Sequence, residues 1–144
     1  MKYTTTMNIS LPREKVIALF DSTENLYKWQ PGLLSFEHIS GETGKEGAQS
    51  RLRYKMGKRE VEMTETITRR NLPEEFTGTY EAKGVWNKQE NFFEEVSAEE
   101  TRWTSISEFR CSGFMKIICW VMPGSFKKQT LQFMNQFKEF AESA

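Results

Sequence analysis

The feature that most constrains this chain is a long run of strand-like segments separated by short turns. The segments lie at residues 33–40, 48–56, 59–69, 74–82, 85–96 and 101–110. The links between them are rich in Gly, Asn and Pro, which favour tight turns. Short links join antiparallel neighbours, because a parallel pair needs a crossover of roughly a dozen residues or more. The sequence therefore predicts an antiparallel meander of six strands.

The segments on either side complete the predicted fold. Residues 3–9 alternate as a seventh strand, and residues 10–20 and 23–29 have the apolar spacing of two short helices. Residues 113–122 fit a short helix of their own. In the tail, apolar side chains recur at helical spacing: Phe126, Thr130, Met134, Phe137 and Ala141.

A seven-stranded sheet cannot cover its own inner face, so the long tail helix is expected to lie on it. The prediction is an α+β protein in which a curved antiparallel sheet surrounds a long C-terminal helix. No internal repeat or linker divides the sequence, so one domain is expected over residues 1–144.

Composition excludes several classes of partner. The 144 residues carry 20 Lys+Arg and 20 Asp+Glu, and no block of five like charges occurs. Nucleic acid is therefore not expected as a partner. The longest nearly apolar run, 114–122, contains Lys116 and falls far short of the ~20 residues that span a bilayer. The first ten residues have no apolar segment of the secretory type, so a cytoplasmic protein is expected.

The residues that bind metals or act as nucleophiles are sparse. Cys111 and Cys119 are the only cysteines, and in a cytoplasmic chain they are expected to be reduced. His38 is the only histidine and follows no nucleophile motif, so a structural or surface position is expected. The glycines of 41–47 lack the spacing of a phosphate-binding loop. Neither a metal nor a cofactor is predicted.

One carboxylate contradicts the strand pattern. In the segment 59–68, Val61, Met63 and Ile67 share the apolar face with Glu65. An isolated buried carboxylate costs several kcal/mol unless it is paired, protonated or hydrated. Glu65 therefore either faces a ligand cavity, as a hydrogen-bonding group or an acid/base, or is solvated or paired with an arginine near its mouth. A bulge that turns it outward is a third possibility.

The same alternation defines a candidate ligand site with an aromatic wall and a few polar groups. The first half of the segment 85–96 is expected to be exposed. Trp86 and Phe92 fall on the same side of this strand and are expected to point inward. The alternative, ordinary core packing, remains open for every member. The candidate residues are Trp29, Tyr54, Met63, Glu65, Tyr80, Trp86, Phe92, Trp103, Ser105, Ser107, Phe109 and Met134.

Several local strings, in this order, resemble those of the START-like (SRPBCC) superfamily, and in particular its polyketide cyclase/dehydrase-like branch. They span nearly the whole chain: residues 12–16, 29–32, 47–48, 69–73, 84–87 and 101–103. The resemblance implies the helix-grip fold, with a cavity between the sheet and the tail helix that members use for lipids, polyketides, quinones or aromatic molecules.

Three functions follow as hypotheses. The first is binding of an apolar or aromatic small molecule without a cofactor. The second is a cyclase- or hydratase-type enzyme with Glu65 as acid/base and Tyr54 or Tyr80 polarising an oxygen. The third is a protein-interaction module similar to chaperone-activating relatives, which a large exposed apolar patch would favour. The sequence does not determine the ligand or the oligomeric state.

Overall fold

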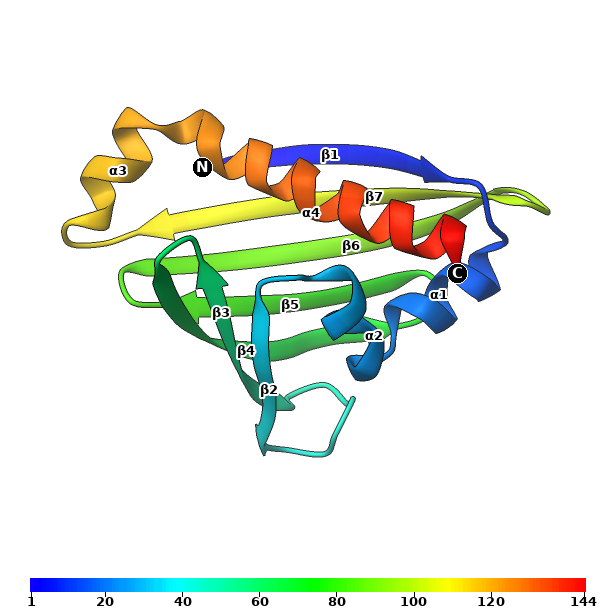
Figure 1. Cartoon of the computed structure of the whole chain (residues 1–144), viewed down its shortest axis with the longest axis horizontal. Helices are drawn as coiled ribbons and strands as arrows, with labels where there is room; N and C mark the ends of the chain where they lie inside the picture. Colours follow the sequence, from blue (N-terminus) through cyan, green and yellow to red (C-terminus); the bar gives the residue numbers. More distant parts are fainter.

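The computed structural model describes residues 1–144 and contains one sheet and four helices (Figure 1). The strands are β1 Lys2–Ile9, β2 Leu33–Ser40, β3 Gln49–Met56, β4 Arg59–Asn71, β5 Glu75–Ala82, β6 Val85–Ser97 and β7 Glu100–Cys111. The helices are α1 Arg13–Phe20, α2 Thr23–Trp29, α3 Met115–Val121 and α4 Pro123–Ser143. The predicted α+β helix-grip architecture is confirmed.

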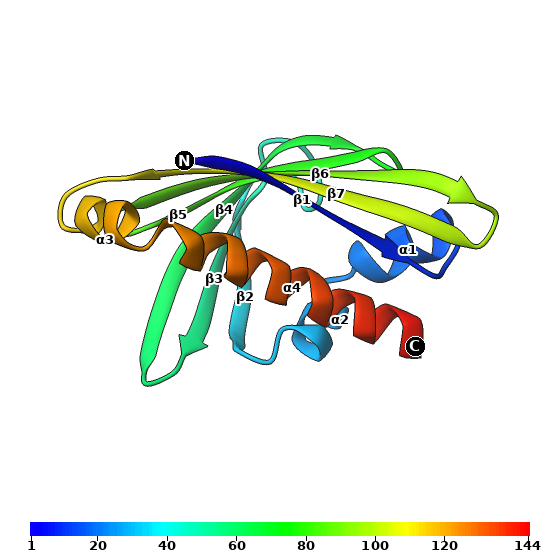
Figure 2. The same ribbon diagram turned by 90° about the horizontal axis from the view of Figure 1, so that it is seen from above.

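The seven strands form one antiparallel sheet in the order β1-β7-β6-β5-β4-β3-β2. Strands β2 to β7 follow one another as the predicted meander, and β1 adds to β7 at the edge. The sheet curves strongly, and α4 runs inside the curve (Figure 2). This arrangement places the inner side chains of every strand toward the space around α4.

The two short helices connect the edge strands β1 and β2. Ser22 caps α2, because its hydroxyl accepts a hydrogen bond from the Asn25 amide at 3.2 Å. Helix α1 begins after Pro12, and its N-terminus has no side-chain cap.

The hydrophobic core lies under the C-terminal half of α4. It joins side chains from all helices except α3 to three strands: Ile9, Val16, Trp29, Phe93, Trp103, Met134, Phe137 and Ala141. Phe20 of α1 meets the rings of Phe93, Trp103 and Phe137 edge-on, with centroids 5.1, 5.7 and 5.5 Å apart. Such aromatic pairs stabilise the core beyond the burial of their surface.

Helix α4 covers the sheet unevenly. It packs against β1 and against the three shorter helices. Near its N-terminus, Phe126 contacts Phe109 with ring centroids 4.6 Å apart, and the Thr130 hydroxyl lies 2.7 Å from that of Tyr3. Both contacts are with the β1–β7 side, so the inner face of β3, β4 and β5 lies away from the helix.

The structure corrects the expectation of free thiols. Cys111 at the end of β7 and Cys119 in α3 form a disulfide. The sequence spacing of eight residues gave no indication of this pairing, because it depends on the turn at Gly113 and Phe114 that brings α3 back toward the strand.

Candidate functional site

Glu65 occupies the inner face of β4, as its strand parity predicted. It lies opposite Ser50 of β3 and Tyr80 of β5 in the two adjacent ladders. Only 9% of its surface is exposed, and it forms no salt bridge. The nearby bulge, between Ile67 and Arg69, comes after Glu65 and does not turn it outward. Of the alternatives for Glu65, pairing with an arginine and an outward turn at a bulge are therefore not observed.

Burial sets the protonation of Glu65. Removal from water disfavours the charged form and raises the pKa of its carboxyl, while a hydrogen bond from Tyr80 opposes that effect. Burial and the adjacent carboxylate also raise the pKa of the Tyr80 phenol far above its usual value of 10.0. Tyr80 is therefore a protonated hydrogen-bond donor at neutral pH.

Glycine at position 78 leaves room for this tyrosine. A Cβ atom built on Gly78 would lie 3.6 Å from the Tyr80 hydroxyl oxygen and 3.2 Å from the Thr66 carbonyl oxygen. The ring of Tyr80 therefore extends back along β5 over Gly78.

A second tyrosine connects the sheet to α2. The Tyr54 hydroxyl of β3 donates a 2.7 Å hydrogen bond to the Gln30 side-chain oxygen. Gln30 is the C-cap of α2 and only 6% exposed. Burial, and then the negative charge of Glu65, raise the pKa of Tyr54 above the ordinary value of 10.0. The sequence analysis did not identify Gln30, since its role depends on the docking of α2 onto β3.

The inward serines bind a residue that the sequence analysis placed in an exposed stretch. Ser105 and Ser107 of β7 donate hydrogen bonds of 3.1 and 2.7 Å to the Gln89 side-chain oxygen. On the same face of β6, Asn91 accepts a 2.9 Å bond from the Trp103 indole. Asn87 is 9% exposed. These contacts show that the amide-rich face of β6 points inward.

The inward placement of Trp86 and Phe92 is therefore wrong. The β6–β7 pairing runs without a register shift from Val85 to Glu95, so these two residues face away from Asn91 and Phe93. The Arg110 guanidinium lies over the Trp86 ring at 4.8 Å, on the outer face. Alternation alone could not choose between Phe92 and Phe93, because adjacent aromatic residues satisfy either parity.

The remaining predicted residues divide into two groups. Trp29, Trp103 and Met134 are buried in the core, with exposures of 3, 0 and 0%. The Trp29 indole nitrogen has no hydrogen-bond partner, which is rare for a buried donor. Away from the core, the inner face of β3, β4, β5 and β7 keeps partly accessible side chains. These are Tyr54, Val61, Met63, Tyr80, Ala82 and Phe109.

These residues define the inner chamber: the inner face of β3, β4 and β5, which lies away from α4, together with Phe109 of β7 at its margin, where Phe126 of α4 packs. It combines apolar side chains with a protonatable carboxyl and two phenols. His38 does not take part, since it is exposed and its Nε2 lies 2.8 Å from the Gly41 carbonyl oxygen.

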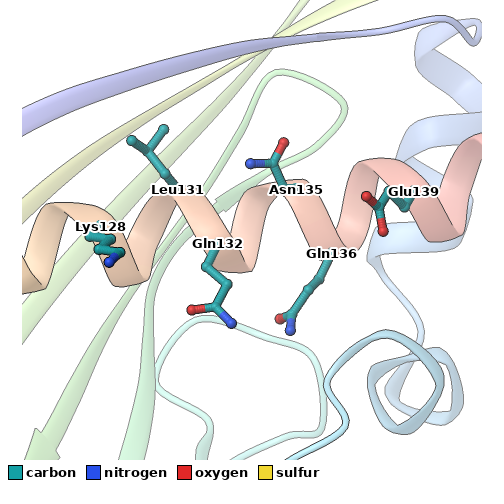
Figure 3. A pocket seen from close by; sticks show the side chains of 6 residues that line it. All are labelled: Lys128, Leu131, Gln132, Asn135, Gln136 and Glu139. Carbon is teal, nitrogen blue, oxygen red and sulfur yellow. The ribbon is translucent and has the colours of Figure 1, made fainter.

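Two open grooves lie outside the inner chamber. One, of about 440 Å³, follows the solvent-facing side of α4, where Leu131 is the only apolar residue among six (Figure 3). The other, of about 600 Å³, lies between the 41–47 turn and the β4–β5 turn and is lined by charged and polar side chains that include Glu46 and Arg70. Neither contains a predicted ligand-binding residue.

No protein-family model matches the sequence, and no curated protein matches it. Solved structures match over almost the whole chain. An aromatase/cyclase from Streptomyces aligns with a TM-score of 0.81 at 13% identity, covering 99% of this chain and 93% of its own. A conserved protein from Geobacillus kaustophilus gives 0.81 at 16% identity, with coverages of 99% and 96%.

A third neighbour is norcoclaurine synthase from Thalictrum flavum, solved in complex with dopamine and hydroxybenzaldehyde. It has a TM-score of 0.73 at 11% identity and covers 97% of this chain and 85% of its own. At these identities the likeness concerns the path of the backbone. With the seven-stranded curved sheet and the long C-terminal helix, it shows that this chain has the same helix-grip fold as these proteins.

Proposed function

We propose that the protein binds an apolar or aromatic small molecule, carrying at least one polar group, in the inner chamber. The observation that carries the proposal is the Glu65–Tyr80 pair. It joins a buried carboxyl to a partly accessible phenol without a cation, on a face that α4 leaves partly accessible. A protein stabilises such a pair poorly by itself, whereas a ligand oxygen or nitrogen would complete its hydrogen bonds.

The chamber offers different contacts to the two parts of such a ligand. Met63, Phe109 and Leu52 provide apolar surface, while Glu65 and Tyr80 fix a polar group in the low dielectric of the interior. Pockets for small molecules commonly combine a mostly apolar lining with a few oriented polar groups. The remaining proposed contact is Tyr54, since Ser105 and Ser107 are buried and donate to Gln89, and Trp29 and Met134 are packed in the core. Two fold neighbours support this class of ligand. One is named as an aromatase/cyclase, and the other is a synthase solved with two aromatic molecules bound.

Native mass spectrometry tests the proposal, since a co-purified ligand adds mass that disappears on denaturation. Anilinonaphthalene sulfonate, an aromatic fluorescent probe, serves if the chamber is empty. Ala82→Trp would fill the chamber from the inner face of β5, whereas Glu81→Trp adds the same side chain on the exposed outer face. We expect Ala82→Trp to abolish binding while Glu81→Trp retains it, with both variants folded by circular dichroism. Equal binding by the two variants would contradict the proposal.

A second candidate function is acid/base catalysis by Glu65 on a molecule bound in the same chamber. The raised pKa of Glu65 favours it, because efficient general acids and bases have pKa values near the working pH. In this scheme Glu65 transfers a proton while the Tyr80 hydroxyl donates a hydrogen bond to a substrate oxygen. With a substrate identified by co-purification, Glu65→Gln should lower turnover by about 100-fold or more while binding remains. Unchanged turnover would leave binding as the function.

A further inference from the structure

Helix α3 exposes a cluster of large apolar side chains to solvent. We call it the α3 patch; its members are Phe114, Ile117, Trp120, Val121 and Met122, with exposures of 75, 58, 84, 62 and 54%. No residue of α3 is buried. Soluble proteins seldom expose a contiguous apolar patch of this kind without a binding role.

The helix is nevertheless held in place. A seven-residue helix is too short to be stable by itself in water. The disulfide between Cys111 and Cys119 fixes α3 to the end of β7, and Met115 packs so closely against Gly84 that a Cβ there would lie 2.8 Å from its Cγ. The structure therefore presents the apolar side chains on a supported element and not on a free tail.

The shape of this end of the molecule is convex. In both ribbon views α3 stands out beyond the ends of the neighbouring strands, at the end opposite the β6–β7 turn (Figures 1 and 2). A projecting apolar element of this kind can insert into a deformable surface. A helix-binding groove in another protein would instead need an apolar stripe along a longer helix.

The segment of sequence that contains the patch carries charges of one sign. No acidic residue occurs between Glu108 and Glu139, although the whole chain has 20. Lys83, Lys116, Lys127 and Lys128 are exposed around or close to α3, and none forms a salt bridge. At the other end of β7, the β6–β7 hairpin carries Glu94 and Glu95 in β6, Glu99 in the turn and Glu100 at the start of β7. The chain has no net charge, but its charges are unevenly distributed, and its basic end lies at the α3 patch.

We propose that the α3 patch docks on the surface of an anionic phospholipid bilayer. The Trp120 indole and the Phe114 ring enter the headgroup region, where amphipathic aromatic rings are favoured. The unpaired lysines then approach the lipid phosphates, each strengthening the attachment within a Debye length of the surface. None of the helices has the length and apolar content needed to cross a bilayer, and the docking proposed here is peripheral.

Docking at α3 also has a consequence for the inner chamber. Helix α3 directly precedes α4. The N-terminal half of α4 lies beside Phe109, next to the accessible part of the inner face. When the protein is docked through α3, this end of the inner chamber would lie next to the bilayer, in which apolar ligands dissolve. This last step rests on the proposed ligand binding, whereas the docking itself does not.

Flotation of the full chain with vesicles tests the docking directly. One set of vesicles is phosphatidylcholine alone, and the other contains phosphatidylglycerol as well. We expect binding to the anionic vesicles with a blue shift of tryptophan emission. Ile117→Ser combined with Trp120→Ser should abolish it, and Lys127→Glu combined with Lys128→Glu should weaken it by about tenfold or more.

Matched variants at other exposed sites serve as controls. Leu34→Ser removes an apolar side chain that is 44% exposed on β2, and Lys15→Glu with Lys28→Glu reverses two exposed lysines of α1 and α2. Both should bind anionic vesicles like the unmodified protein. Binding of anilinonaphthalene sulfonate in the inner chamber is measured separately by comparing Ala82→Trp with Glu81→Trp. A failure of the docking can therefore be distinguished from a failure of the ligand proposal.

Three results would overturn the docking. One is no flotation with either vesicle type. Another is equal binding to both vesicle types, which would remove the role of the lysines. The third is binding that survives loss of Ile117 and Trp120. If flotation fails and light scattering shows concentration-dependent association that Trp120→Ser abolishes, the patch joins two copies of the chain instead.

Discussion

Glu65 on β4 and Tyr80 on β5 lie directly opposite each other in an antiparallel ladder, and the phenol lowers the pKa of the carboxyl that burial raises. Both groups are removed from bulk water, and neither has a cationic neighbour. Their effects on each other differ: the phenol favours the ionised form of Glu65, whereas the negative charge of that carboxylate makes ionisation of Tyr80 more costly.

Replacing Glu65 by Gln should make stability less dependent on pH. The pKa of Glu65 is raised from 4.5 on folding, so the folded state binds more protons than the unfolded state above that pH. Stability then falls as pH rises from 4.5 through the folded-state pKa, and the loss persists at neutral pH. We expect Glu65→Gln to be more stable by roughly 1 to 3 kcal/mol at neutral pH and to match the parent in acid. Urea unfolding across a pH series measures this; parallel curves would contradict it.

Replacing Tyr80 by Phe should raise the pKa of Glu65 further. The hydrogen bond from Tyr80 is what lowers that pKa against the effect of burial, so its removal leaves burial unopposed. The pH range over which stability falls should extend upward, with a loss of about 1 to 3 kcal/mol at neutral pH. Carbon-13 titration of the Glu65 carboxyl measures the shift. Tyr27→Phe is the control, since that hydroxyl accepts a bond from the Phe36 amide at the surface.

Two phenylalanines of α4 should differ in their contribution to stability, although both contact Trp29. The Phe133 and Phe137 rings lie 4.7 and 5.1 Å from the Trp29 ring, yet Phe133 is 36% exposed and Phe137 is fully buried. We expect Phe137→Ala to lower the free energy of unfolding by about 3 to 5 kcal/mol. Phe133→Ala should cost clearly less. Similar losses of stability in the two variants would show that the hydrophobic core extends along α4 to Phe133.

Loss of the disulfide should release α3 locally. Because α3 has no buried residue, the bond from Cys119 to Cys111 is its main attachment to the sheet. We expect Cys119→Ser to be cleaved by trypsin after Lys116 much faster than the parent, with the sheet resisting digestion. The parent treated with reductant should behave like the variant. Equal protection of both forms would show that packing alone holds α3.

Much of the inner face was predictable. Tyr54, Met63, Glu65 and Tyr80 share a face in the structure because period-two alternation fixes side-chain direction within an unbroken strand. The same rule failed for β6, where Asn87, Gln89 and Asn91 face inward. Polar residues at inward positions give no hydrophobic signal, and only their partners on β7 reveal the direction.

The sequence by itself determined the order of the elements, the antiparallel meander and the long amphipathic tail helix, because these follow from local periodicity and short turns. The tertiary structure alone decided which part of the inner face α4 covers, the pairing of Cys111 with Cys119, and the lack of a cation beside Glu65. Each of these depends on contacts between residues distant along the chain or on the path of a turn. Local sequence patterns do not specify such contacts, since they arise only when the sheet curves and the helices dock.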